Sequence, residues 1–225
     1  MTKQTYALLE NFMISCMDHS AHDKEHVYRV LYQALEIAET EPDVDYDVLI
    51  AACLLHDIGR QAQFENPALC HAVAGAQMAH AFLTEQGFGE DFARKVSHCI
   101  HAHRFSNRLH PESPEAKILF DADKLDVTGA MGIARTLLYQ GSLDQPLYSL
   151  LPNGSVSDGT EDTAPSFFQE YKRKLERLYE TFYTAKGRQL AQTRKADAVA
   201  FYRALYEETA KTYIRGKEML PAKIQ

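Results

Sequence analysis

The feature of this chain that most constrains its fold is a helical spacing of apolar residues along most of its length. In residues 24–40, apolar side chains recur at steps of three and four, at Val27, Val30, Leu31, Ala34, Leu35 and Ala38. This spacing places them on one face of an α-helix. We find no convincing segment in which apolar and polar residues alternate, the pattern typical of a half-buried strand. The chain is therefore predicted to be all-α.

Similar patterns predict further helices between residue 47 and the C-terminal region. They cover roughly residues 47–55, 67–86, 91–103, 117–139, 168–182 and 195–213. Glycine and proline residues separate several of these segments, as expected where helices end. No internal repeat is evident.

A chain of 225 residues can form one large domain with a substantial core. We expect a single domain over residues 1–225, with its core in about 20–140 and C-terminal helices from 166–215 packing on that core. Residues 141–165 contain three prolines and three glycines and are predicted to form a flexible loop. A loop of this length is either functional, such as a lid over a site, or a surface excursion.

The composition is that of an ordinary globular protein, with 45% hydrophobic and 24% charged residues. The formal net charge of −7 provides no global attraction to duplex nucleic acid or to an anionic membrane. The four cysteines lack Cys-x-x-Cys spacing, which indicates a reducing compartment. No apolar stretch suggests a signal sequence or a membrane span. We therefore expect a cytoplasmic protein.

The chain contains two histidine-bearing segments and a later acidic segment whose side chains could converge on one divalent metal ion. Their polar residues are His22, Asp23 and His26, then His56 and Asp57, then Asp121, Asp123 and Asp126. Two imidazoles and two carboxylates form a mixed nitrogen and oxygen ligand set that suits such an ion. An ion held in this way can generate a hydroxide nucleophile at neutral pH.

The histidines also have ordinary structural interpretations. A hydrogen-bonded cap would equally explain His56 and Asp57 at the end of an apolar helix, where polar side chains need partners. His22 and His26 are four residues apart and share a helix face. Because His26 lies deeper, beside apolar residues, it is the better ligand candidate of the two.

The acidic segment offers more carboxylates than one ion needs. Asp121 and Asp123 are two residues apart, so in a helix their side chains point in different directions. We therefore expect only one of them to bind the ion. Asp126 follows Asp123 by three residues, where it could orient a histidine ligand through a hydrogen bond or could simply face solvent.

The order of these residues resembles the HD superfamily of metal-dependent phosphohydrolases. Residues 22–30, 54–59 and 122–126 are similar to its successive signature motifs, and the tail resembles a bacterial branch of uncharacterised HD-domain hydrolases. The likeness extends over roughly residues 20–140. It implies a helical bundle with a metal site between helices. It also implies the metal ligands His26, His56, Asp57 and Asp123.

The same resemblance implies roles for residues outside the ligand set. His71 and His103 could hold a second ion or a substrate phosphate, and the segment after His103 favours it over His101. Cations close to the motifs could clamp a phosphate, because guanidinium groups match phosphate oxygens; these are Arg60, Arg104 and Lys124. Hydrogen-bonded histidines and solvated surface charges are the competing interpretations. The predicted catalytic residues are His56, Asp57, Lys124 and Arg60.

The predicted activity is hydrolysis of a phosphoester or phosphoanhydride bond in a nucleotide or another small phosphorylated metabolite. The cofactor would be one or two divalent ions, with Mn, Fe, Co, Ni, Zn and also Mg as candidates. A di-iron oxygenase and a non-catalytic nucleotide sensor are the alternative functions. The sensor is less favoured, because no member of the ligand set is missing. The sequence predicts no oligomeric state.

Overall fold

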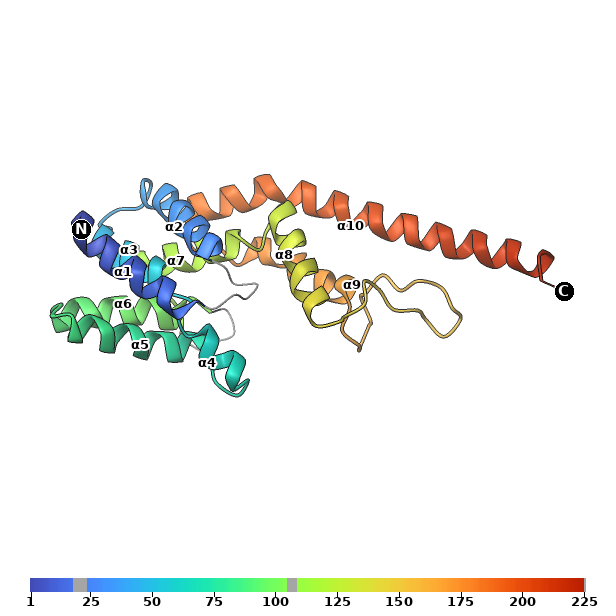
Figure 1. Ribbon diagram of the computed structural model, residues 1–225. Helices are drawn as coiled ribbons and strands as arrows, with labels where there is room; N and C mark the ends of the chain where they lie inside the picture. The colour runs from blue at the N-terminus through green and yellow to red at the C-terminus, as the bar shows by residue number, and fades with distance from the viewer. Residues whose placement is uncertain (18–23, 105–108, 225) are drawn as a thin grey trace. The chain divides into compact units, whose positions relative to one another are not determined.

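The computed structural model describes residues 1–17, 24–104 and 109–224, and it confirms the all-α prediction (Figure 1). Within these ranges no extended strand forms, and an isolated antiparallel bridge pairs Leu150 with Val156. The first eight helices are α1 (Lys3–Cys16), α2 (Lys24–Ala38), α3 (Tyr46–Leu55), α4 (Arg60–Glu65), α5 (His71–Glu85), α6 (Glu90–Ala102), α7 (Pro114–Leu125) and α8 (Gly129–Ser142). The later ones are α9 (Phe167–Glu170), the π-helix η1 (Tyr171–Leu175), the 3-10 helix η2 (Leu178–Glu180), α10 (Ala185–Met219) and the 3-10 helix η3 (Leu220–Ala222).

Contacts within the chain define two compact units. The first unit comprises residues 1–126 and 182–188, and the second comprises residues 127–181 and 189–225. Each unit is described separately below.

Helix α3 forms the centre of the first unit. Seven of its ten residues are buried, and α3 packs against α1, α2, α6 and α7. The Asp45 side chain caps the start of α3 by accepting hydrogen bonds from the backbone N–H groups of Asp47 and Val48. The end of this buried helix therefore brings His56 and Asp57 into the interior of the unit, where both are at most 1% exposed.

Two glycines allow the turn after α3 to approach α5 closely. A Cβ atom on Gly59 would collide with the carbonyl oxygen of His71 and with the backbone nitrogen of Gly75. Gly75 in turn lies against the backbone nitrogen of Gly59 and the carbonyl oxygen of His56. The absence of side chains at these two positions therefore brings the His56 turn against the first turns of α5.

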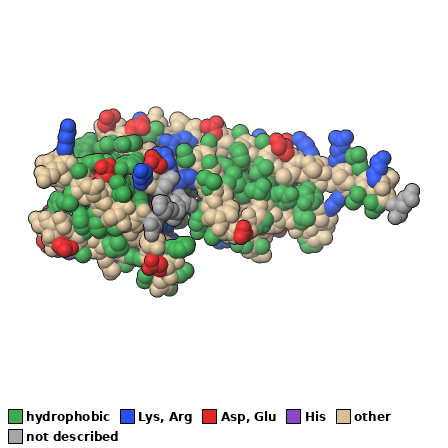
Figure 2. All heavy atoms as spheres, in the orientation of Figure 1, with side chains coloured by type: hydrophobic (Ala, Val, Ile, Leu, Met, Phe, Trp, Pro, Cys, Tyr) green, Lys and Arg blue, Asp and Glu red, His purple; other side chains and the backbone are tan. Residues whose placement is uncertain are grey.

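The second unit has a core of aromatic side chains. The rings of Tyr171 and Tyr202 stack with centroids 4.0 Å apart, and Phe168 packs edge-on against Tyr202. The chain between α8 and α9 is held to this core, because Val156 is buried and the Tyr202 hydroxyl donates to the carbonyl of Asp158. Figure 2 shows hydrophobic side chains gathered over this unit on the face drawn. Its exposed apolar residues include Leu138, Tyr139, Leu143, Leu147 and Leu150.

The structure corrects several predicted elements. A single helix over residues 117–139 is wrong, because α7 ends at Leu125 and α8 begins at Gly129. Thr128 is extended and Gly129, the first residue of α8, has a φ of 61°, so a right-handed helix cannot continue through these two residues. The helix expected over 67–86 begins at His71, and that expected over 195–213 extends from 185 to 219. Helices α1 and α4 were not predicted.

None of the helices in the three described ranges combines the length and apolar character needed to cross a bilayer.

Candidate metal centre

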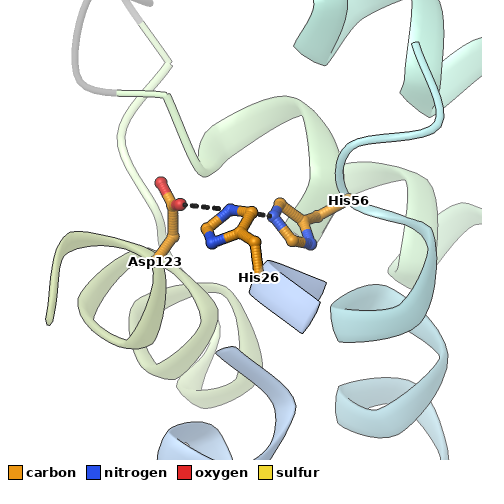
Figure 3. Close-up of side chains that lie close together, drawn as sticks. All are labelled: His26, His56 and Asp123. Atoms are coloured by element: carbon orange, nitrogen blue, oxygen red, sulfur yellow. Dashed lines mark hydrogen bonds and ion pairs between the residues drawn. The ribbon is translucent and has the colours of Figure 1, made fainter. Parts of the chain in front are cut away.

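Three side chains, from two helices and from the turn after a third, converge in the interior of the first unit (Figure 3). His26 comes from α2, His56 immediately follows α3, and Asp123 lies in the last turn of α7. The His26 Nε2 atom lies 3.4 Å from His56 Nε2 and 3.4 Å from Asp123 Oδ1. One potential ligand atom from each of the three residues falls within 4.8 Å of the others. We call this group the first cluster.

A second cluster lies directly beside the first. It consists of Asp57, His71 and His103, whose potential ligand atoms also lie within 4.8 Å of one another. Asp57 Oδ1 is 3.6 Å from His71 Nε2 and 3.8 Å from His103 Nε2. All three residues are at most 2% exposed.

Asp57 belongs to the second cluster but also faces the first. Its Oδ2 atom is 3.6 Å from His26 Nε2 and 3.7 Å from His56 Nε2, on the side of the first cluster. Its Oδ1 atom faces the second cluster. One carboxylate therefore presents a different oxygen to each group of imidazoles.

A hydrogen bond made by Nδ1 orients each of the four imidazole rings. The Nδ1 atoms of His56 and His103 lie 2.8 Å and 2.6 Å from the carbonyl oxygens of Cys53 and Ile100. Because a carbonyl oxygen can only accept, each of these Nδ1 atoms must carry the proton. In the neutral rings the Nε2 lone pair is therefore directed into the clusters.

The other two rings have side-chain partners at the same position. His26 Nδ1 lies 2.7 Å from Asp126 Oδ2, and His71 Nδ1 lies 2.8 Å from Gln63 Oε1. A carboxylate accepts from an N–H, so His26 also carries its proton on Nδ1. His71 Nε2 is buried, and no hydrogen-bond partner for it is found among the described residues.

Burial favours the neutral form of three of the four imidazoles, those of His56, His71 and His103. It lowers the pKa of His56 below its ordinary value of 6.5, lowers that of His103 to about 4 and lowers that of His71 to about 2. Desolvation of the charged ring is the largest cause in each case. These rings are therefore available as neutral nitrogen ligands at neutral pH.

The carboxylates of Asp57 and Asp123 stay ionised because neighbouring cations stabilise their charged form. Burial alone would raise the pKa of Asp57 and Asp123, but neighbouring positive groups outweigh it. The Arg60 guanidinium holds the pKa of Asp57 well below its ordinary value of 3.8. The Lys124 ammonium group does the same for Asp123.

This donor set fits a divalent metal ion. Two nitrogens bound to one ion at ~2.1 Å and at roughly tetrahedral or octahedral angles lie roughly 3.0–3.4 Å apart. The 3.4 Å between His26 Nε2 and His56 Nε2 agrees with that separation. The His56 ring is protonated at Nδ1, so its Nε2 lone pair faces the space between these two atoms, where a cation would be bound. Buried neutral imidazoles and ionised carboxylates are the protonation states that metal binding needs.

The predicted cations lie at the edges of the two clusters. Arg60 donates from Nε to Asp57 Oδ1 at 2.9 Å, and Lys124 donates from Nζ to Asp123 Oδ2 at 2.7 Å. Arg104 donates from Nη1 to the Cys70 sulfur at 3.4 Å, next to the start of α5. Arg60 and Lys124 therefore each contact a carboxylate of the clusters, whereas Arg104 is directed to the residue preceding His71.

The two aspartates of the acidic segment have separate environments. Asp123 faces the histidines, whereas Asp121 accepts hydrogen bonds from the backbone N–H groups of Tyr183 and Thr184 at 2.9 Å and 2.7 Å. The Thr184 hydroxyl also donates to Asp121. Asp121 thus binds the chain just before α10. His22 and Asp23 lie outside the described residues.

Two residues near the clusters had no role assigned from the sequence. Gln63 lies on the unpredicted helix α4, so its hydrogen bond to His71 had no detectable signal. Arg29 follows His26 by three residues on the same helix face and lies within the motif at residues 22–30, and these two signals could have singled it out. Its guanidinium contacts Asp126.

Comparisons with known proteins identify the family. Residues 24–128 match the HD domain family. The uncharacterized protein YpgQ of Bacillus subtilis (strain 168) is 30% identical over 195 residues, which cover 85% of this chain and 86% of that protein.

Two crystal structures have the same fold as this chain. The structure of B. subtilis YpgQ in complex with ADP covers 90% of this chain and 97% of its own, with 27% identity and a TM-score of 0.70. A predicted HD superfamily hydrolase from an uncultured Thermotogales bacterium is 31% identical, with a TM-score of 0.60, and covers 90% of this chain and 91% of its own. The chain therefore belongs to the HD-domain superfamily, and the Thermotogales member of that superfamily is described as a predicted hydrolase.

Proposed function

We propose that this protein is a metal-dependent phosphohydrolase that cleaves a phosphoester or phosphoanhydride bond by attack of water. The observation that supports this most strongly is the pair of adjacent buried clusters, both of which the Asp57 carboxylate faces. Neutral imidazoles and ionised carboxylates directed into one small volume are costly to bury unless a cation compensates them.

In this proposal His26, His56, Asp57 and Asp123 hold the first ion. Asp57, His71 and His103 are the residues that would hold a second. The two oxygens of Asp57 face different clusters at 3.6 Å from His26 Nε2 and from His71 Nε2, so Asp57 is suited to serve both ions.

A divalent ion bound here would lower the pKa of water toward ~7 and stabilise negative charge on phosphoryl oxygens. Two cations of the chain, Arg60 and Lys124, would add to this stabilisation of negative charge. Arg60 is about 29% exposed and can donate to a phosphate from the guanidinium edge that does not contact Asp57. Lys124 holds Asp123 in its ionised form and adds positive charge beside it.

We infer that the substrate is a nucleotide or a comparably small phosphorylated metabolite. The relative YpgQ, 30% identical to this chain, has been crystallised with ADP. That complex favours a nucleotide over other phosphate compounds. The proposed ions include Mn, Fe, Co, Ni, Zn and Mg, because a set of imidazoles and carboxylates without thiolates accepts all of these.

The proposal is tested by measuring bound metals and product release on one purified sample. Metal content is determined by elemental analysis, and phosphate or pyrophosphate release is measured over a panel of nucleotides and phosphoesters with Mn²⁺, Co²⁺ or Mg²⁺. We expect metal-dependent release that disappears in His56→Ala and in Asp57→Ala. His80→Ala is the matched control, because His80 is exposed and pairs with Glu90 away from both clusters.

Two outcomes would replace this proposal. About two irons per chain without phosphate release would favour a di-iron oxygenase. Tight nucleotide binding without turnover for any added metal would favour a nucleotide sensor.

A further inference from the structure

Arg29 and Asp126 form an ion pair directly behind His26. Arg29 donates from Nε to Asp126 Oδ1 at 2.7 Å and from Nη2 to Asp126 Oδ2 at 3.1 Å. The same Oδ2 atom lies 2.7 Å from His26 Nδ1. Asp126 and His26 are each 1% exposed, whereas the Arg29 side chain is 33% exposed. The three groups thus form a chain of contacts from the protein surface to the first cluster.

Helix geometry explains why these groups meet. His26 and Arg29 are three residues apart on α2, and Asp123 and Asp126 are three residues apart at the end of α7. Residues three apart lie on the same face of a helix. Where α2 packs against α7, one pair of contacts joins His26 to Asp123 and the other joins Arg29 to Asp126. Helix α7 ends at Leu125, and Asp126 is its C-cap residue.

His26 differs from His56 and His103 in the group that holds its Nδ1 atom. His56 and His103 contact backbone carbonyls of their own turns, whose positions the helix determines. The partner of His26 is a side-chain carboxylate a hundred residues away, which can rotate about its own bonds. A guanidinium that donates to both oxygens of a carboxylate restricts rotation of that carboxylate, since the two N–H groups match the spacing of the two oxygens.

We propose that Arg29 is a positioning residue that acts through Asp126 to hold the His26 ring with Nε2 directed at the metal. This inference rests on the proposed metal site for its consequence, but the ring orientation itself is a property of the metal-free protein. Loss of outer groups that orient metal ligands typically weakens metal binding by roughly 10–100-fold.

The first test measures the tautomer of His26 without metal. Long-range ¹H–¹⁵N correlation spectra of chelator-treated protein at neutral pH report which ring nitrogen carries the proton, with His26→Gln used to assign the signal. We expect the wild-type ring to be protonated at Nδ1 alone. In Arg29→Gln and in Asp126→Ala, a second population protonated at Nε2 should appear. Arg29→Lys keeps the positive charge but cannot donate to both oxygens of Asp126 in the same way. Its Nε2-protonated population should therefore lie between those of the wild type and Arg29→Gln.

The second test measures metal affinity and asks whether Arg29 acts through Asp126. Mn²⁺ titrations of wild type, Arg29→Gln, Asp126→Ala and the double variant complete a mutant cycle. We expect Arg29→Gln to weaken binding by roughly 10-fold, and the double variant to bind no more weakly than Asp126→Ala. Arg94→Gln is the control, because Arg94 also donates to an aspartate oxygen at 2.7 Å but on the exposed surface of α6.

The inference is overturned if His26 in Arg29→Gln keeps the wild-type tautomer. It is also overturned if the Arg29→Gln and Asp126→Ala losses of affinity simply add. A wild-type protein that binds no divalent metal would contradict the proposed function instead, and the tautomer spectra would then decide the role of Arg29 alone. Circular dichroism and thermal unfolding establish that each variant is folded; if Asp126→Ala is not, Asp126→Asn replaces it.

Discussion

At the scale of single residues, the chemistry of this protein depends on which atom of each side chain is already engaged. Each imidazole of the two clusters has a partner at Nδ1, so its Nε2 atom is directed inward. Asp57 divides its two oxygens between the clusters. The same principle separates Asp123 from Asp121, because the oxygens of Asp121 are occupied by backbone and hydroxyl donors.

The two aspartates should respond differently to substitution by asparagine. We expect Asp123→Asn to weaken metal binding by at least roughly 10-fold, with little effect on the metal-free fold. Asp121→Asn should lower the free energy of unfolding by about 1–3 kcal/mol, since it weakens hydrogen bonds to a buried charge, and should leave metal affinity unchanged. Metal titration and urea unfolding of chelator-treated protein measure the two effects. The reverse pattern would assign the ligand role to Asp121.

The pKa of His103 predicts how stability changes with pH in the absence of metal. Its pKa is about 4 in the folded protein and 6.5 ordinarily. Between these values the unfolded chain binds a proton that the folded protein excludes, so the free energy of unfolding falls as the pH drops from 6.5 toward 4. His71 contributes in the same direction. Urea unfolding of chelator-treated protein should show a shallower decline in His103→Gln; equal slopes would contradict this account.

At the scale of elements, the site is assembled by the ends of helices. The end of α3, the start of α5, the end of α6 and the last turn of α7 each bring one or two polar residues into an otherwise apolar interior. Helix α2 contributes His26 from its first turn. Close packing at Gly59 and Gly75 determines how near the α3 turn comes to α5, and therefore how near Asp57 comes to His71.

Substitution at Gly59 should disturb this approach. Gly59→Ala introduces a Cβ atom against the backbone of His71 and Gly75, which cannot move aside as a flexible side chain would. We expect the free energy of unfolding to fall by about 1–3 kcal/mol. Gly216→Ala is the control, because Gly216 lies in α10 and a Cβ atom there meets no heavy atom within 4 Å, and it should be stabilising by about 0.5–1 kcal/mol. Equal effects of the two substitutions would contradict the steric argument.

At the scale of the whole molecule, both clusters belong to one of the two compact units. All of the proposed ligands lie in residues 1–126, within the first unit. The second unit has its own aromatic core and contributes none of the ligand atoms in these clusters. Metal binding should therefore stabilise the two units unequally.

Hydrogen exchange can measure this difference. A ligand that binds only the folded state at 100 times its Kd stabilises that state by about 2.7 kcal/mol. We expect added Mn²⁺ to slow exchange in α2, α3, α5 and α7 of the first unit, with a smaller change in the aromatic core of the second. His56→Ala should show no metal-dependent slowing. A gain of equal size in both units would show that metal binding is not local to the first.

The fold class and the chemical character of the site could both be predicted from the order of amino acids. Apolar spacing identified the helices because burial of one face imposes a period that is readable in one dimension. It did not reveal the break between α7 and α8, which depends on the positive φ of Gly129, or helix α4, which has no buried residue and so no apolar stripe. The motifs showed which residues could bind a metal, and the comparisons confirmed the HD-domain superfamily.

Which of these side chains contact one another depends on the packing of the helices. Asp121 and Asp123 are equivalent as carboxylates, and they differ because α7 directs one toward the histidines and the other toward the chain before α10. The position of Asp57 between two clusters and the contact of Arg29 with Asp126 span residues far apart in the chain. Such contacts depend on how helices pack and rotate against one another, and local spacing along the chain carries no information about that packing.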